Sequence, residues 1–160
     1  RLLDIALINK DGKYVINKKW VGKDAGKFLK ELGIDADPRL IICETPENHP
    51  FVSTEMMMPI LPIVRVSSID EAIQMAVKAE HGNRHSAHIH SKNIDHLTRF
   101  ARAIETTIFV KNAPSYAGIG AGGEGHTTFT IAGPTGEGLT SARSFTRQRR
   151  CVMVDGLHII

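Results

Sequence analysis

The sequence has few cysteines and no long apolar segment, and these two absences exclude whole classes of protein. Cys43 and Cys151 are its only cysteines, too few for the disulfide framework of a small secreted domain. The longest apolar stretches, residues 56–64 and 104–110, are interrupted by Pro, Glu or Thr and fall short of the ~18 residues that a membrane-spanning helix needs. We therefore expect a protein of a reducing cytoplasm with no membrane partner.

The first residues also lack two features of a natural N-terminus. Arg1-Leu-Leu-Asp-Ile-Ala-Leu7 contains no initiator Met and no charged-then-apolar signal pattern. The segment begins as if inside a structural element, so we expect a piece of a longer polypeptide. With 160 residues, 42% of them hydrophobic and 23% charged, the chain suits one globular domain with a core.

The chain carries a net charge of +3, and much of the positive excess is local. Such a cluster is either a solvated face or a contact for a phosphate-bearing ligand, nucleic acid or acidic partner. Aromatic residues are sparse, with Trp20, Tyr14 and Tyr116 far apart, which argues against a base-stacking surface for nucleic acid. A basic α/β binding module remains the alternative function. The clustered residues are Arg143, Arg147, Arg149 and Arg150.

Strand and helix patterns alternate along the chain, which predicts an α/β fold with parallel strand pairing. In the first helix Gly33 is expected to cap the C-terminus, and in the second Ser68 and Glu71 form a capping box. Predicted strands span residues 14–17, 40–43, 61–66 (with Pro62 near its start), 86–90, 107–110, 127–132 and 150–154; predicted helices span residues 24–32, 69–80, and from Asn93 or Asp95 to Ile104.

Eight of the 14 glycines fall between Gly118 and Gly138. Gly118-Ile-Gly-Ala-Gly-Gly123 matches the dinucleotide-binding pattern, but strand-like residues follow it where that fingerprint requires a helix. No Lys precedes Thr140-Ser141, which excludes a phosphate-binding P-loop. Since ordering glycine is entropically unfavourable, the region is expected to have a function.

Other reactive side chains give weaker indications. His88 and His90 would share one face of a strand and form a feasible pair of metal ligands, but no third ligand lies nearby, so we expect no metal site. Cys43 and Cys151 lie in apolar strand patterns that favour a core position. Glu55 precedes an apolar run and a Pro, where it is either a cap or the acceptor of specific hydrogen bonds.

Several long blocks in a fixed order resemble one enzyme group. They are Glu55-Met-Met-Met-Pro-Ile-Leu-Pro-Ile-Val-Arg65, His81-Gly-Asn-Arg-His85, Phe109-Val-Lys-Asn112 with Pro114-Ser-Tyr-Ala-Gly118, and Thr130-Ile-Ala-Gly-Pro-Thr-Gly-Glu-Gly-Leu-Thr-Ser-Ala142. From about Trp20 onward the chain is similar to the CoA-acylating aldehyde dehydrogenases of the propanediol- and ethanolamine-utilisation type. The resemblance implies a three-layer α/β fold with a mostly parallel sheet, part of the aldehyde dehydrogenase catalytic domain.

The resemblance also implies a reaction. Such enzymes oxidise a short aldehyde, here acetaldehyde or propionaldehyde, with NAD and pass the acyl group to coenzyme A. A cysteine thiolate attacks the aldehyde, and the resulting acyl-enzyme thioester is cleaved by the CoA thiol. The family works in the bacterial cytoplasm, in some cases inside a microcompartment.

Four residues match positions with a role in the family. Glu55 matches the Glu that holds the nicotinamide ribose hydroxyls, and Met57 stands in the Phe position of the same Glu-x-Phe-Gly-Pro motif, where it would pack on the cofactor. Asn112 matches a strand-ending Asn near the substrate pocket, and Phe129 falls near a pocket-lining Phe. The loop of residues 114–125 is expected to shape the entry for aldehyde or CoA.

The resemblance also shows what the segment lacks. The family's nucleophilic cysteine and its NAD-binding Rossmann domain lie upstream, and neither Cys43 nor Cys151 matches that nucleophile. Residues 1–160 are therefore expected to be the C-terminal portion of the catalytic domain, inactive alone and with no catalytic residue of its own. The C-terminal strand, about residues 150–160, is expected to pair between subunits of a homo-oligomer.

Overall fold

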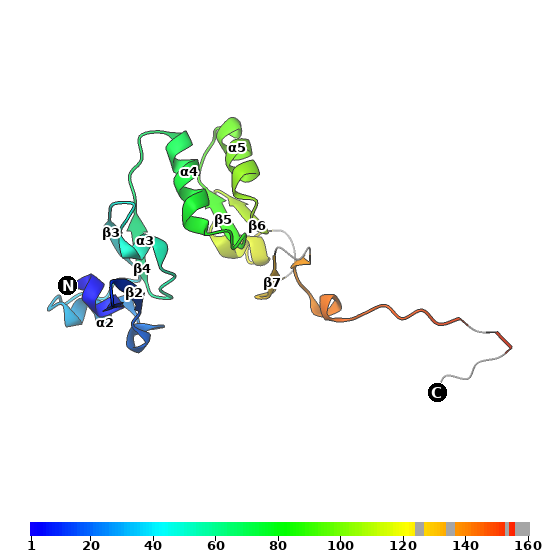
Figure 1. The fold of residues 1–160 in the computed structure, drawn as a ribbon, viewed down its shortest axis with the longest axis horizontal. Coiled ribbons are helices and arrows are strands. Elements are labelled where there is room, and N and C mark those ends of the chain that lie inside the picture. The colour runs from blue at the N-terminus through cyan, green and yellow to red at the C-terminus, as the bar shows by residue number, and fades with distance from the viewer. Residues whose placement is uncertain (124–126, 134–136, 153, 156–160) are drawn as a thin grey trace. The chain divides into compact units, whose positions relative to one another are not determined.

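The computed structural model describes residues 1–123, 127–133, 137–152 and 154–155. They fall into two compact units, Arg1–Ala79 and Glu80–Ile160 (Figure 1). Each unit contains one pair of parallel strands, and the candidate site residues are divided between the units.

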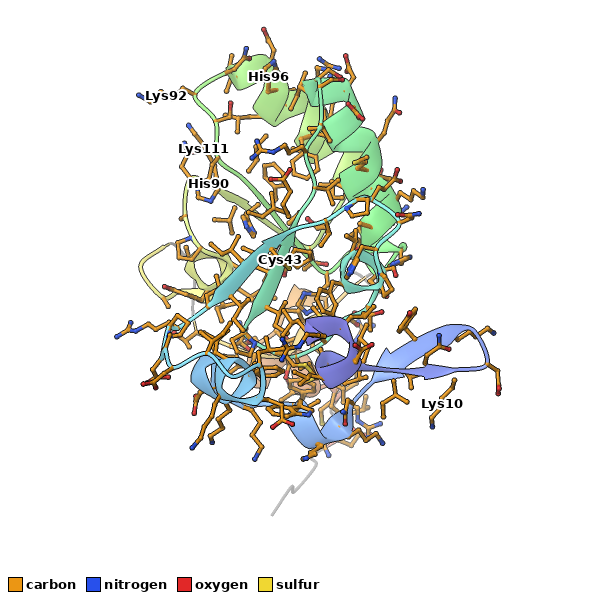
Figure 2. The ribbon with its side chains drawn as sticks, turned by 90° about the vertical axis from the view of Figure 1, so that its left-hand side faces the viewer. Lys10, Cys43, His90, Lys92, His96 and Lys111 are labelled. Carbon is orange, nitrogen blue, oxygen red and sulfur yellow. The ribbon has the colours of Figure 1, made fainter. Side chains whose placement is uncertain are left out.

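The first unit begins with the short helix α1 (Leu2–Ala6) and a hairpin of β1 (Leu7–Lys10) and β2 (Lys13–Ile16). The turn between the strands is Asp11-Gly12, with φ of 52° and 84°, the left-handed pair that a two-residue hairpin loop requires. Figure 2 shows Lys10 at the outer end of this hairpin. β2 confirms the predicted strand within one residue, whereas β1 is an element that the sequence analysis missed.

A helix and a small core follow the hairpin. The turn η1 (Lys18–Trp20) leads to α2 (Ala25–Glu31), which begins after Asp24 as predicted. Gly33 beyond its end has φ of 78°, which confirms the glycine at the helix C-terminus. The helix places Phe28, which has no exposed surface, in a core to which α1, β1, α3, β4 and the turn before β4 also contribute: Ala6, Leu7, Phe28, Phe51, Met56 and Ile60.

The parallel pair of the first unit is β3 (Ile41–Glu44) with β4 (Ile60–Ile63), and α3 (Pro50–Ser53) lies between them in sequence. The expected strands and their parallel pairing are confirmed. Pro62, expected near a strand start, is instead the third residue of β4, opposite Cys43. Proline is tolerated here because β3 is the only strand beside β4 in the described structure. The other edge of β4 therefore needs no N–H donor.

Helix α4 (Ile69–Glu80) has the predicted bounds, but its cap differs in detail. Ser68 Oγ accepts from the Glu71 N–H at 3.2 Å, as expected of a capping box. The Glu71 carboxylate, however, accepts from the N–H and the Oγ of Ser67, both at 2.7 Å, rather than from Ser68. These hydrogen bonds, the backbone one first, lower the pKa of Glu71.

In the second unit, β5 (Ser86–Ile89) and β6 (Ile108–Lys111) are parallel and are joined through α5 (Ile94–Ile104). Of the two predicted helix starts, Asn93 is the cap: its Oδ1 accepts from the N–H groups of Asp95 and His96. The apolar face of α5 is buried, and the Phe100 ring meets Phe109 of β6 with centroids 5.6 Å apart.

The glycine-rich part of the second unit contains η2 (Ser115–Ile119), β7 (Ile131–Ala132), β8 (Gly138–Leu139) and η3 (Ala142–Phe145). The strand predicted over residues 127–132 is therefore wrong except for its last two residues. The described residues of 150–154 do not form the strand predicted there. A strand needs a neighbouring strand for its backbone hydrogen bonds, and these residues have none among the described residues. Met153 lies outside the described residues.

The parallel pairs bear out the α/β prediction, but the sheets are small. The described residues form four sheets of two strands each, two parallel and two antiparallel. The described strands form no single mostly parallel sheet, and the three-layer arrangement stays a prediction.

Candidate functional site

The turn before β4 presents Glu55 and Met57 to solvent. Met56, between them, is buried in the core, which fixes the turn to the rest of the unit. Met57 has φ of 56°, a conformation strained for a side chain, and leaves 68% of its surface exposed. Its carbonyl accepts from the Gly22 N–H at 3.2 Å, so the loop before α2 supports the turn.

The Glu55 carboxylate is exposed, and no described residue gives it a hydrogen bond or an ion pair. Its two oxygens are therefore available to hydroxyl donors from outside the chain. Glu55 does not cap α3. That helix ends at Ser53, and the N–H that closes it is donated by Thr54 to the Pro50 carbonyl. Of the two interpretations left open by the sequence, the described residues show no cap formed by Glu55, and its role as an acceptor of specific hydrogen bonds stays a prediction.

A cavity of about 520 Å³ lies against the exposed side of Met57. Its wall combines apolar surface with two cations, Lys23 and Arg39, and two carboxylates, Asp24 and Asp37. A cavity of this size and mixed chemistry suits part of a nucleotide, with a flat ring on apolar surface and hydroxyls near a carboxylate. The remaining lining residues are Gly22, Ala25, Pro38, Met58 and Pro59.

Asn112, in the second unit, is engaged within the chain. Its φ is 54°, and its side-chain amide forms two hydrogen bonds with the backbone of Ser91: Oδ1 accepts from the N–H at 2.8 Å and Nδ2 donates to the carbonyl at 3.0 Å. Asn112 also donates its own N–H to the Ile89 carbonyl at 2.9 Å. The residue thus clamps the carboxyl ends of β5 and β6 together.

Phe129 and the loop after Asn112 are the other predicted pocket elements. Phe129 is 87% exposed, so its large apolar ring faces solvent. Gly118 brings η2 against β6, since a Cβ there would collide with the Ile108 side chain. Residues 124 and 125, the end of the loop predicted to form an entry, lie outside the described residues.

His88 lies on β5 and His90 follows the end of that strand, and the pair has a neighbour that the sequence analysis missed. His88 Nδ1 lies 3.2 Å from Ser115 Oγ, and the His88 and His90 rings stand edge to face with centroids 5.8 Å apart. Ser115 is 27 residues away in sequence, and no local pattern could have paired them. In the part of the chain that the structure describes, no three His, Cys, Asp or Glu side chains gather to hold a metal ion.

The two cysteines differ. Cys43 is half-buried on β3 (Figure 2), and this burial raises the pKa of its thiol. Its Sγ lies 3.8 Å from the Leu61 carbonyl. Cys151 is exposed, so the prediction that it belongs to the core is wrong: among the described residues, neither Cys151 nor Val152 pairs with a strand.

The fold and this divided set of residues match one family. The chain belongs to the aldehyde dehydrogenase family, whose sequence model matches residues 20–146. Among curated relatives, the acetaldehyde dehydrogenase (acetylating) EutE of Salmonella typhimurium is 54% identical over 155 residues, which are 96% of this chain and 33% of the relative. The chain therefore spans about a third of the length of such relatives, and the predicted resemblance to the CoA-acylating group is confirmed.

Solved structures agree. The propionaldehyde dehydrogenase of Rhodopseudomonas palustris, with bound CoA and an acylated cysteine, is 56% identical with a TM-score of 0.87, over 95% of this chain and 34% of that one. A propionaldehyde dehydrogenase from the fucose-utilisation microcompartment of Clostridium phytofermentans is 57% identical with a TM-score of 0.85, over 98% and 35%. An engineered glycolyl-CoA reductase with bound NADP+ is 56% identical with a TM-score of 0.87, over 95% and 34%.

One negative expectation can be checked directly. Among the residues that the structure describes, no helix combines the length and the apolar character needed to cross a membrane.

Proposed function

We propose that the protein to which this chain belongs oxidises a short aldehyde, acetaldehyde or propionaldehyde, with NAD and transfers the acyl group to coenzyme A through a cysteine thioester. The similarity to an enzyme holding CoA and an acylated cysteine carries this proposal. In the balanced reaction, aldehyde, CoA thiol and NAD+ give acyl-CoA, NADH and a proton. NAD, when bound, supplies the hydride acceptor.

The turn before β4 fits a nucleotide cofactor. The exposed Glu55 carboxylate would accept hydrogen bonds from the ribose hydroxyls, and Met57 would pack its exposed side chain on the cofactor beside the 520 Å³ cavity. The strained φ of Met57 supports this role, since strain of this kind persists where it serves binding. One relative is solved with NADP+, so the same turn would accept either dinucleotide.

The substrate pocket would draw on the second unit. One acceptor position and one donor position of the Asn112 amide are taken by Ser91, so Asn112 would act by fixing the start of the following loop. Phe129 would supply apolar surface for the alkyl chain or for CoA. The nucleophile is expected in neither cysteine of this chain, because the burial of Cys43 disfavours its thiolate and Cys151 lies in the described stretch 146–152, which forms no helix or strand.

The test is NADH absorbance with propionaldehyde, NAD and CoA all saturating. The 160-residue chain alone should give a flat line, and an N-terminally extended gene product should give a steady rise. In the extended protein, Glu55→Gln should raise the KM for NAD roughly tenfold, the loss expected when a charged hydrogen-bond acceptor is removed. A rise from the chain alone that is abolished by mutating Cys43 or Cys151 would place the nucleophile here and overturn the expectation that it lies upstream. A flat line from the extended gene product would overturn the proposed function.

Assembly and location are part of the same proposal. The apolar side chains Val152 and Val154 are 70% and 76% exposed, and we infer that their segment pairs with another subunit of a homo-oligomer. Sedimentation of the extended protein with and without residues 150–160 tests this pairing, and an unchanged oligomer would contradict it. The microcompartment origin of one relative supports a bacterial cytoplasmic enzyme enclosed in such a compartment.

A further inference from the structure

A second depression in the first unit is lined by four lysines, a tryptophan and one glutamate. It has a volume of about 550 Å³ and is lined by residues of η1 and of α2, the helix labelled in Figure 1, and by Lys23 between them. We call it the lysine–tryptophan depression. Its lining residues are Lys19, Trp20, Lys23, Lys27, Lys30 and Glu31.

The charges of this depression are poorly balanced. Only Lys27 has an acidic partner, with its Nζ 3.8 Å from Asp24 Oδ2. No described residue places a carboxylate within ion-pair distance of Lys19, Lys23 or Lys30. Because Lys27 and Lys30 are one turn apart on α2, their like charges destabilise the helix. An anion bound among these ammonium groups would remove the repulsion.

The tryptophan is held firmly at the same place. Trp20 packs on Phe28 with ring centroids 4.7 Å apart and planes at 41°, and Phe28 has no exposed surface. Trp20 itself remains partly exposed and lines the depression, with Lys19 Nζ 5.7 Å from its ring centroid. A fixed aromatic surface bordered by cations is the combination that binds a base by stacking and its phosphates by charge.

We propose that the lysine–tryptophan depression binds a nucleoside polyphosphate, with the base against Trp20 and the phosphates among Lys23, Lys27 and Lys30. Its volume lies within the range of small-ligand sites. The proposal does not depend on the dehydrogenase reaction, since none of these residues has a part in the function proposed above except Lys23, which also borders the cavity beside Met57. A merely solvated basic face predicts the opposite: weak attraction for any polyanion, with no contribution from a base.

Trp20 is the single tryptophan of the chain, so its fluorescence reports directly on the depression. The experiment titrates the 160-residue chain with ATP, ADP, AMP, adenosine and pyrophosphate, and repeats the ADP titration by equilibrium dialysis. We expect saturable quenching whose affinity falls in the order ATP, ADP, AMP, adenosine, and falls as salt is added. Pyrophosphate that binds as tightly as ADP would show that the base contributes nothing and would overturn the proposal.

Two triple variants of equal charge provide the matched control. Lys23→Gln, Lys27→Gln and Lys30→Gln together should weaken ADP binding by roughly tenfold or more, because the cations nearest the phosphates are removed. Lys10→Gln, Lys13→Gln and Lys92→Gln together remove the same charge elsewhere and should leave the ADP affinity within about twofold. Equal losses in both variants, or no retention of ADP in dialysis, would overturn the site. Lys30→Gln alone repeats the test if the triple variant loses its circular dichroism.

Discussion

The two parallel strand pairs differ in what covers them. Between β5 and β6 the chain forms α5, three turns long, which buries its apolar face and brings Phe100 against Phe109. Between β3 and β4 the chain forms only the four-residue α3, and Ile42, Leu61 and Ile63 remain 62%, 46% and 42% exposed. A strand–helix–strand segment covers its own sheet only when the crossover helix is long enough, and the apolar β3–β4 surface needs cover from elsewhere.

The largest expected effect tests this difference in cover. Phe100→Ala should lower the free energy of unfolding by about 3–5 kcal/mol, because it empties a packed position between α5 and β6. Ile42→Ala, on the uncovered pair, should cost less than about 1 kcal/mol. Urea unfolding followed by circular dichroism measures both. Similar losses in the two variants would mean that the β3–β4 surface is covered in the same protein.

The clamp at the end of β5 and β6 gives the next effect. Asn112→Ala should lower the free energy of unfolding by about 2 kcal/mol. The substitution removes two hydrogen bonds to Ser91, and it leaves an alanine at φ of 54°, a left-handed conformation that alanine adopts at a cost and asparagine tolerates through its side-chain hydrogen bonds. Asn112→Gly keeps the backbone conformation and should cost about half as much. Glu55→Gln is the control in the other unit and should leave the unfolding curve unchanged. Equal losses of stability in Asn112→Ala and Asn112→Gly would show that the left-handed backbone contributes nothing to the difference.

In the turn before β4 a substitution should stabilise. Met57→Gly relieves a left-handed conformation and should raise the free energy of unfolding by about 0.5–1 kcal/mol, while weakening NAD binding in the extended protein. Met58→Gly is the control: its backbone φ is not positive and its side chain packs on the core, so it should destabilise. A loss of stability in Met57→Gly would contradict this prediction, because it would mean that the Met57 side chain makes stabilising contacts despite its exposure.

The smallest effect is a pH dependence at the start of α4. The pKa of Glu71 is lowered in the folded state, so the unfolded chain binds more protons there and the stabilisation is present at neutral pH. It should be lost as the pH falls through the lowered pKa, below the ordinary glutamate range. Glu71→Gln should flatten the acid limb of a stability–pH curve, whereas Glu31→Gln, exposed on α2, should not. Identical acid limbs in both variants would contradict the role of Ser67.

The three longest helices, α2, α4 and α5, were predictable because their signals are local, whereas the short α1 and α3 were missed. The parallel pairs followed from the alternation of strands and helices. The apolar period and the Asn93 cap of α5 place it within one residue, and Gly33 marks the end of α2. β1 was missed because only Leu7 in it is buried, so no alternating apolar pattern exists. The strands predicted over 127–130 and 150–154 have β-like residues but no neighbouring strand within the described chain, and propensity alone forms no sheet.

Less of the candidate site was predictable. Glu55 and Met57 were identified by resemblance, and the sequence could not show that one carboxylate is unpaired or that the methionine backbone is left-handed. The reverse holds for Asn112, whose matched position suggested a pocket but whose amide is used by Ser91, 21 residues away. The lysine–tryptophan depression was missed because its members become one surface only when η1 and α2 fold together.

The amide clamp also affects how the backbone exchanges hydrogen with water. Ser91 lies outside every helix and strand, where amide protons normally exchange as fast as loops open. Its N–H is nevertheless donated to Asn112 Oδ1 at 2.8 Å. That proton exchanges once the Asn112 side chain releases it, so one loop amide records how often the clamp itself opens.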